Sequence, residues 1–222
     1  MAWHGVEGHD PIVEQFRRAV QRNRLASSFL FVGPEGVGKR TFAIRLAQAL
    51  LCEMRSEAEL DPCGTCPACR QVATDSHPDV HLVGKPAEKS FLPLELLVGS
   101  KDHRGREGLC HDISLRPYSG KRRIAIIDDA DYLNAEGANA LLKTLEEPPP
   151  KSILILIGTS PAKQLPTIRS RCQMVRFSRL PTETVANLLG REGILEEPEK
   201  ASQLAQHSEG SVTRGMELAD SA

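Results

Sequence analysis

One glycine-rich loop places the strongest constraint on how this chain folds. Residues 33–40 read GPEGVGKR and lie between an apolar run, residues 28–32, and a segment with helical spacing that begins after Lys39. A strand, a glycine loop and a helix in this order are typical of a phosphate-binding loop, in which backbone N–H groups and a lysine hold phosphates. A glycine turn with an incidental lysine is the alternative. The loop predicts an α/β fold built on a parallel sheet.

The loop departs from the working motif at one position. A hydroxyl that binds Mg²⁺ normally follows the lysine, but Arg40 stands there and Thr41 comes one residue late. One residue at the start of a helix turns a side chain by about 100°. The backbone and Lys39 are expected to hold ATP or ADP weakly, whereas the missing hydroxyl argues against Mg²⁺. The expected nucleotide contacts are Gly33, Pro34, Glu35, Gly36, Val37, Gly38, Lys39, Arg40 and Thr41.

A second motif carries acids at the end of a buried strand. Residues 124–131 read IAIIDDAD, and Asp128 stands where phosphate-loop folds place the acid that holds magnesium. The next residue is normally a glutamate that orients the attacking water, but here it is Asp129. Aspartate is one methylene shorter, which withdraws the carboxylate by about 1.5 Å. Both departures together predict weak or absent hydrolysis; the alternative is that the acids only cap the strand.

Composition excludes several function classes. The 222 residues carry a formal net charge of −1, so any contact with nucleic acid must come from a local patch. Aromatic residues make up 4%, too few to favour a base-stacking platform. No apolar run reaches the roughly 18 residues of a membrane span, and the N-terminus lacks the regions of a signal peptide, so a cytoplasmic protein is expected. The local basic cluster, either a DNA contact or solvated surface, is Lys101, His103, Arg104 and Arg106.

Cysteine spacing predicts a metal site. Cys63, Cys66 and Cys69 form C-x-x-C-x-x-C, and Cys52 is the natural fourth ligand. Two-residue spacings let thiolates converge on one ion, and full thiolate ligation gives the closed tetrahedral site of structural Zn²⁺. An iron–sulfur cluster and reduced free thiols are the alternatives. Residues weighed and set aside as ligands are His77, His81, Cys110 and Cys172.

The order of predicted elements indicates an α/β sheet followed by a small helical segment. Apolar strands alternate with helices as far as residue 178, which indicates a parallel sheet covered on both faces. Residues 179–222 read as an all-helical lid, and residues 52–69 as an inserted zinc module. Residues 91–98 are read as a strand or an apolar arm, and 107–115 as a helix. The expected strands are 28–32, 123–129, 153–157 and 173–177, and the expected helices are 10–22, 134–147, 182–190, 196–207 and 212–220.

Longer motifs give a family resemblance. GPEGVGKR, IIDDADYLN with ANALLKTLEEPPP after it, and TSPAKQLPTIRSRCQ resemble bacterial clamp-loader subunits of the AAA+ class over most of residues 1–220. Among them the chain is most similar to the DNA polymerase III delta prime subunits, whose loop and acid motifs are commonly degenerate. The resemblance implies a P-loop AAA+ sheet, a helical lid, and a zinc module held by four cysteines.

The resemblance also assigns roles to three residues. Arg171, in the run SRC, would reach into the nucleotide site of a neighbouring subunit as an arginine finger. Thr159 would sense the terminal phosphate, and Arg214 would reach the nucleotide from the lid. From the residues alone, the alternatives are a solvated charge for Arg171 and for Arg214 and a turn residue for Thr159. Arg169 lies close enough to Arg171 to be confused with it in an experiment.

The expected function follows from the resemblance. The chain would be a subunit of the DNA polymerase III holoenzyme, in an assembly that uses ATP to open the sliding clamp and close it around primed DNA. The implied partners are the gamma/tau and delta subunits, with the clamp and DNA contacted through the complex. The family's C-terminal collar domain has no counterpart in residues 1–222, so the isolated chain is expected to be a monomer. An active gamma/tau-like ATPase and a scaffold that binds no nucleotide are the alternatives.

Overall fold

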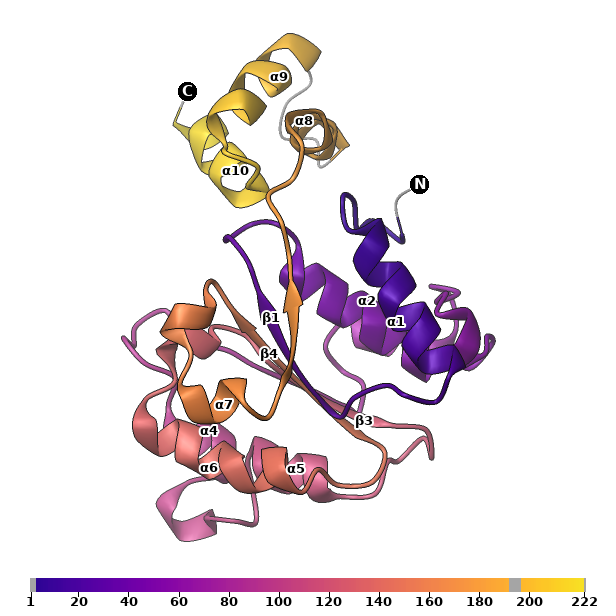
Figure 1. Cartoon of the computed structure of the whole chain (residues 1–222), viewed down its shortest axis with the longest axis vertical. Helices are drawn as coiled ribbons and strands as arrows, with labels where there is room; N and C mark the ends of the chain where they lie inside the picture. The colour runs from indigo at the N-terminus through magenta and orange to yellow at the C-terminus, as the bar shows by residue number, and fades with distance from the viewer. Residues whose placement is uncertain (1–2, 192–196, 222) are drawn as a thin grey trace.

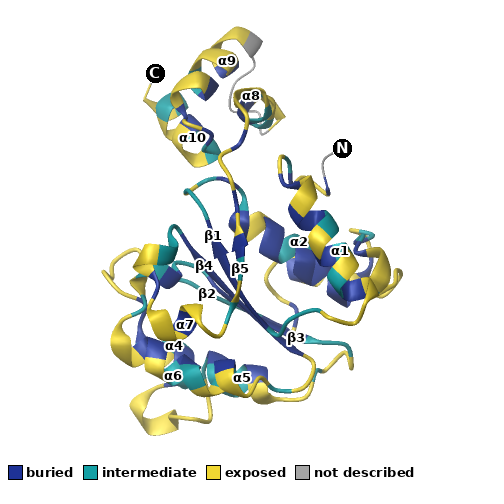
Figure 2. Cartoon of the chain, in the orientation of Figure 1, coloured by how far each residue is buried: buried dark blue, intermediate teal, exposed yellow. Residues whose placement is uncertain are grey.

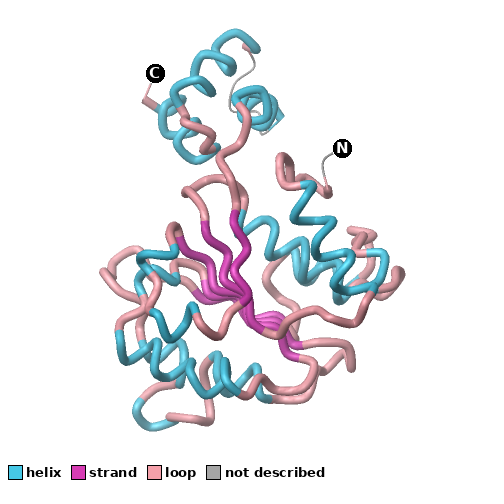
Figure 3. The backbone as a smooth tube through the Cα atoms, viewed as in Figure 1, coloured by secondary structure: helices cyan, strands magenta, loops and turns pink. Residues whose placement is uncertain are grey.

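A five-stranded parallel sheet forms the centre of the molecule. The computed structural model describes residues 3–191 and 197–221. The strand order is β2-β3-β4-β1-β5, and every pairing is parallel. Figure 3 shows the strands gathered in the middle of the molecule, with helices around them. The predicted α/β class is therefore confirmed, with β2 as a strand that the apolar pattern did not predict. The strands are β1 (Ser28–Val32), β2 (Val80–Val83), β3 (Arg123–Ile127), β4 (Ser152–Gly158) and β5 (Gln173–Arg176).

Helices cover both faces of this sheet. In Figure 1, α1 and α2 lie on one side of the strands and α4, α5, α6 and α7 on the other. The central strands are buried along their whole length, because each face of a parallel sheet lies against helices (Figure 2). The helices are α1 (Asp10–Gln21), α2 (Lys39–Leu51), α3 (Pro67–Ala73), α4 (Leu94–Val98), α5 (Leu109–Ser114), α6 (Ala135–Glu146) and α7 (Pro166–Arg169).

Alternate residues of each strand enter different hydrophobic cores. Phe29 and Phe31 of β1 face the core under α1 and α2, whereas Leu30 and Val32 face the core under α4 to α7. The first core is rich in phenylalanine: the rings of Phe31 and Phe42 have centroids 5.7 Å apart, and others pack around them. This packing fixes α2, and with it the loop that precedes α2, against the middle of the sheet.

The stretch between β2 and β3 contains helices rather than a strand. Residues 94–98 form α4 and residues 109–114 form α5, so the expected helix at 107–115 is present and the strand option for 91–98 is wrong. Leu92 and Leu97 are fully buried, but their partners belong to the helical layer of the second core, not to the edge of the sheet.

A group of helices follows the last strand. These are α8 (Thr182–Arg191), α9 (Pro198–His207) and α10 (Val212–Asp220), close to the expected ranges; residue 196, an expected helix start, lies outside the described residues. In Figure 1 they stand apart from the sheet, beyond the end of β5. Val212 N–H nevertheless donates to the carbonyl of Gly36 at 2.9 Å, which links α10 to the glycine loop. Among the described helices none has the length and apolarity needed to cross a membrane.

Asp79 is a fully buried carboxylate that joins β2 to the turn before β3. It accepts hydrogen bonds from the N–H groups of Tyr118 at 2.6 Å and Ser119 at 2.8 Å, and its carboxylate lies 3.6 Å from Arg123 Nε. Burial by itself would raise the pKa of Asp79, but the Ser119 and Tyr118 N–H groups and the Arg123 charge lower the pKa overall. The stability that this carboxylate contributes is therefore present above its unfolded pKa and is lost as the pH falls through its folded pKa.

Asp79→Asn is expected to destabilise the fold by about 2 to 4 kcal/mol, because the amide replaces a charged acceptor and leaves Arg123 without its counter-charge. Urea unfolding at neutral pH measures the difference. Asp75→Asn is the matched control, since Asp75 is exposed and has a left-handed φ of 52° that asparagine tolerates. Equal unfolding free energies for both variants would contradict the structural role of Asp79.

Candidate functional site

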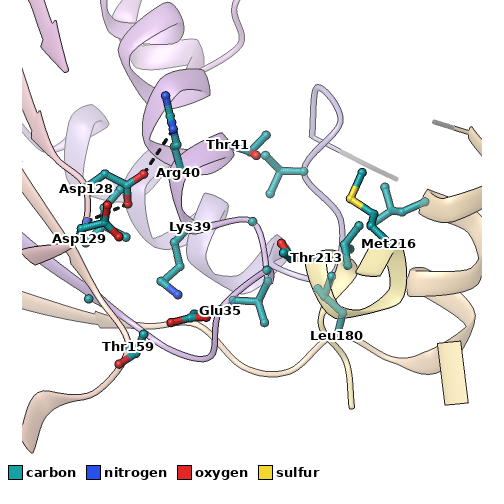
Figure 4. Close-up of a pocket in the computed structure, with 18 of the residues that line it drawn as sticks. Glu35, Lys39, Arg40, Thr41, Asp128, Asp129, Thr159, Leu180, Thr213 and Met216 are labelled. Atoms are coloured by element: carbon teal, nitrogen blue, oxygen red, sulfur yellow. Dashed lines mark hydrogen bonds and ion pairs between the residues drawn. The ribbon is translucent and has the colours of Figure 1, made fainter. Parts of the chain in front are cut away.

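A pocket of about 500 Å³ lies between the glycine loop, the acids after β3 and the C-terminal helices (Figure 4). Its size suits a nucleotide-sized ligand. Gly33 and Pro34 are not among the residues that line it, but both carbonyls bind Lys39 behind the loop. The predicted site residues that do line the pocket are Glu35, Gly36, Val37, Gly38, Lys39, Arg40, Thr41, Asp128, Asp129 and Thr159.

The glycine loop has the backbone shape that its sequence predicts. Gly36 and Gly38 have φ values of 68° and 94°, which side-chain-bearing residues adopt only with strain. Gly38 leads directly into α2, whose N-terminal N–H groups favour a bound anion. Lys39 is only 7% exposed, and its ammonium donates to the carbonyls of Gly33 at 2.7 Å and Pro34 at 2.5 Å. Burial lowers the pKa of Lys39, while Asp128, Glu35 and Asp131 oppose this.

His9 contacts the glycine loop at the backbone of Val37. Its ring is buried, with Nε2 lying 2.7 Å from the carbonyl oxygen of Val37 and the ring packed edge-on against Phe177 at 4.8 Å. Burial lowers the pKa of His9, which favours the neutral ring. A neutral ring holds the Val37 peptide in place without adding a charge next to the N–H groups of the glycine loop.

The magnesium position does not fit a metal ion. Arg40 Nη1 lies 3.6 Å from Asp128 Oδ2, and Figure 4 shows Arg40 on the Asp128 side of the start of α2 with Thr41 on the opposite side. A guanidinium has no lone pair to offer a metal and remains charged at any ordinary pH. It also repels a divalent cation from the one carboxylate that would bind it. Arg40 therefore replaces the usual hydroxyl ligand and opposes Mg²⁺ coordination by Asp128.

The backbone conformation of Asp129, the second acid after β3, directs its carboxylate toward the residues that follow the end of β2. Asp129 has a left-handed φ of 58°, and its Oδ2 accepts from the N–H of Lys85 at 3.3 Å, beyond the end of β2. Burial raises the pKa of Asp128, and the adjacent Asp129 charge raises it further; Arg40 works in the opposite direction. Asp129 is thus tied to the neighbouring strand end rather than placed freely over the loop.

Asp131 is a site residue that the sequence reading missed. Its buried carboxylate accepts from both the N–H of Thr159 at 2.9 Å and the hydroxyl of Thr159 at 2.5 Å, and it also accepts from the Gln164 amide. Lys163 Nζ lies 3.8 Å away. The run DDAD contained the signal, because an acid four residues after a strand end can turn back over the end of the neighbouring strand. Asp131 thus fixes Thr159 at the wall of the pocket.

The far end of the pocket is apolar and comes from both ends of the chain. No local motif could have indicated these residues, because they meet only when the C-terminal helices pack near the loop. They provide a surface that can cover the flat apolar part of a ligand, and are Val6, Leu180, Leu188, Val212 and Met216.

Arg171 and Arg214 do not line this pocket. Arg171 follows α7, where its guanidinium donates to Glu146 at 2.6 Å and to the carbonyl of Thr167 at 3.0 Å. Arg214 stands in the first turn of α10, but its guanidinium pairs with Glu209 at 2.7 Å. The nucleotide contact expected of Arg214 thus remains a prediction that would require this pair to open.

Two of the four residues of the basic cluster between α4 and α5 lie close to acids. Arg104 lies 3.5 Å from Glu136, and His103 lies 3.9 Å from Glu107. Such exposed pairs are typical of solvated surface, so the DNA contact weighed for this cluster gains no support from its geometry.

The cysteines come together as predicted. The sulfurs of Cys52, Cys63, Cys66 and Cys69 all lie within 4.8 Å of one another, and those of Cys63 and Cys69 are 4.0 Å apart. A tetrahedral zinc site with bonds of about 2.3 Å places sulfurs about 3.8 Å apart, so the cluster fits a metal ion of this kind. The N–H of Cys66 donates to Cys63 Sγ at 3.3 Å and, with Thr65, lowers the pKa of Cys63 to about 6. That shift favours the thiolate, the form that binds metal.

Comparison with known proteins identifies the family. The family model described as "DNA polymerase III, delta subunit" matches residues 8–181. The chain belongs to this DNA polymerase III subunit family. It is 29% identical over 219 residues to the DNA polymerase III subunit delta' of Bacillus subtilis, covering 98% of this chain and 61% of that protein. It is 30% identical over 221 residues to the subunit tau of Escherichia coli, covering 98% of this chain and 32% of that protein.

The chain spans about three fifths of the delta' relative's length and a third of the tau relative's. Among solved structures, the RuvB Holliday junction branch migration motor of Thermotoga maritima matches with a TM-score of 0.55 at 16% identity, covering 97% of this chain and 61% of that one. At this identity the likeness concerns the fold, and it confirms the predicted P-loop architecture.

The loop and α10 touch at Gly36. A Cβ on Gly36 would lie 2.3 Å from Ser211 Oγ and 2.8 Å from Thr213 N, whereas a Cβ on Gly38 would meet nothing within 4 Å. Gly36→Ala should therefore push α10 from the loop and open the pocket, while Gly38→Ala should cost only backbone strain of about 1 kcal/mol. Hydrogen exchange of α10 amides measures the opening. Similar exchange in the two variants would show that α10 does not depend on the loop.

Proposed function

We propose that this chain is a clamp-loader subunit whose own pocket is weak or inactive in hydrolysis and whose Arg171 acts in the nucleotide site of a neighbouring subunit. The observation that carries the proposal is the position of Arg171 relative to the pocket. Phe29 pairs with Gln173 and Val32 with Arg176, and the glycine loop follows Val32. Arg171 precedes Gln173, at the start of β5. It therefore lies toward the end of the strands opposite the glycine loop, since the strand from Gln173 to Arg176 spans about 10 Å.

The contacts of Arg171 suit a role outside its own chain. Glu146 and the Thr167 carbonyl hold the guanidinium at the surface, and the side chain is 32% exposed. A guanidinium fixed in this way can meet a phosphoryl group of a neighbouring subunit, where it would stabilise the charge that develops during transfer. The pocket of this chain, in contrast, contains an arginine where hydrolysis needs a metal-binding hydroxyl.

The proposed partners follow from the family. They are the gamma/tau and delta subunits of DNA polymerase III, with the sliding clamp and primed DNA contacted through the assembled loader. The apolar end of the pocket supports a nucleoside ligand, and the loop and Lys39 support its phosphates.

Arg171→Ala is expected to reduce turnover at the adjoining site by about 10³-fold or more. The measurement is DNA-stimulated ATPase in a reconstituted loader in which only the adjoining ATPase subunit keeps its phosphate-loop lysine. Arg169→Ala is the matched control, because Arg169 is an exposed arginine at the end of the same short helix. Assembly, followed by sedimentation, should be unchanged in both. Full turnover in Arg171→Ala would rule out the finger.

An active ATPase of the gamma/tau type is the second candidate, supported by Lys39, Asp128 and Thr159 around one pocket. It would show magnesium-dependent turnover in the isolated chain, lost in Lys39→Ala. A scaffold that binds no nucleotide would show neither turnover nor binding.

The cysteine cluster is proposed to hold a structural Zn²⁺. Four thiolates leave no open coordination position, so the ion would cross-link the end of α2 to α3 and take no part in chemistry.

The purified chain should contain about one equivalent of zinc, and Cys63→Ser should lose most of it. Elemental analysis measures the content, with Cys172→Ser as control, since Cys172 lies outside the cluster and burial raises its pKa to about 12. Iron in place of zinc, or zinc retained in Cys63→Ser, would contradict the assignment.

A further inference from the structure

The positions that hold Mg²⁺ in a working phosphate loop are joined to each other in this chain. Arg40 occupies the place of the hydroxyl ligand, and its guanidinium lies 3.6 Å from the Asp128 carboxylate. The ion pair therefore bridges the same two elements, the start of α2 and the end of β3, that a metal ion would bridge. Arg40 remains 58% exposed at the pocket, so its other N–H groups are accessible to a ligand.

The local charges favour a fixed cation at this point. The pocket is lined by Glu7, Glu35, Asp128, Asp129 and Asp131, against Lys39 and Arg40. Three of these acids form ion pairs within the chain: Asp128 with Arg40, Asp131 with Lys163, and Glu7 with Arg191. Glu35 and Asp129 then remain to repel additional negative charge near the phosphates.

We propose that this pocket binds a nucleoside diphosphate without a metal ion, with Arg40 taking the place of Mg²⁺ between Asp128 and the phosphates. The loop N–H groups and Lys39 supply the remaining contacts. Lys39 has weaker partners to give up, because its ammonium now binds the neutral carbonyls of Gly33 and Pro34. A diphosphate is preferred because a triphosphate brings one more charge toward Glu35, which lies beside Lys39 in Figure 4.

The inference rests on the proposed function only in treating the pocket as a nucleotide site, and Arg171 has no part in it. The two proposals can therefore fail separately. If Arg171→Ala left loader turnover unchanged, nucleotide binding by this chain would not be affected, and if this chain bound no nucleotide, the effect of Arg171→Ala on loader turnover would still be expected.

Fluorescence anisotropy of the 222-residue chain with a ribose-labelled ADP tests the inference, in excess EDTA and in excess MgCl₂. The wild type is expected to bind in EDTA at least as tightly as in MgCl₂, because free ADP is the ligand. Arg40→Thr, which restores the hydroxyl, should bind at least about tenfold more weakly in EDTA and should be tightened by MgCl₂. Arg40→Lys should retain binding in EDTA, since it keeps the charge. Arg22→Thr, at an exposed arginine just after α1, is the matched control and should behave as wild type.

Three results would overturn the inference: tighter binding of the wild type in MgCl₂ than in EDTA, the same metal response in Arg40→Thr as in the wild type, or no binding in either buffer. Labelled ATP binding more tightly than labelled ADP in EDTA would overturn the preference for a diphosphate.

Discussion

Parallel pairing of β1 with β4 and β5 is the interaction on which the whole site depends. Because Val32 lies opposite Gly158 and Arg176, the chain leaves three neighbouring strands at the same level of the sheet. The glycine loop, Thr159 and Phe177 follow directly. A Cβ on Gly33 would lie 2.3 Å from the Phe177 carbonyl oxygen, so the loop passes close against the end of β5. The two faces of β1 enter different cores, so a slip of one residue would exchange Phe29 and Phe31 with Leu30 and Val32 and disrupt the packing of both.

Several acids lie at this end of the strands, and a basic side chain of the protein balances part of their charge. Asp128 and Asp129 directly follow β3, and Asp131 turns back over Gly158. In a metal-dependent site a divalent ion balances such acids only when ligand is present. Here Arg40, which is part of the chain itself, lies beside Asp128 and balances its charge without a bound metal.

The sequence allowed the loop, the acids after β3 and the cysteine cluster to be predicted, because each depends on residues close together in the chain or on fixed spacing. It did not reveal Asp131 as the partner of Thr159, since that contact depends on the pairing of β3 with β4. β2 was missed because His81 interrupts its apolar pattern; in the fold His81 lies 2.9 Å from Arg123 at the covered edge of the sheet. The apolar end of the pocket was beyond prediction, since Val6 and Met216 lie at opposite ends of the chain.

Arg171 and the pocket are separated by the length of a strand, and this separation makes their roles independent. Arg171 is positioned by Glu146 at the end of α6 and by the last turn of α7, whereas Lys39 and Arg40 are positioned by β1 and α2. No described side chain belongs to both sets of contacts. Substitutions that remove metal binding from the loop therefore leave the surroundings of Arg171 unchanged. A chain with this fold can therefore change at its phosphate loop and keep the surface around Arg171 as it is, because the sheet places the two at opposite ends of its strands.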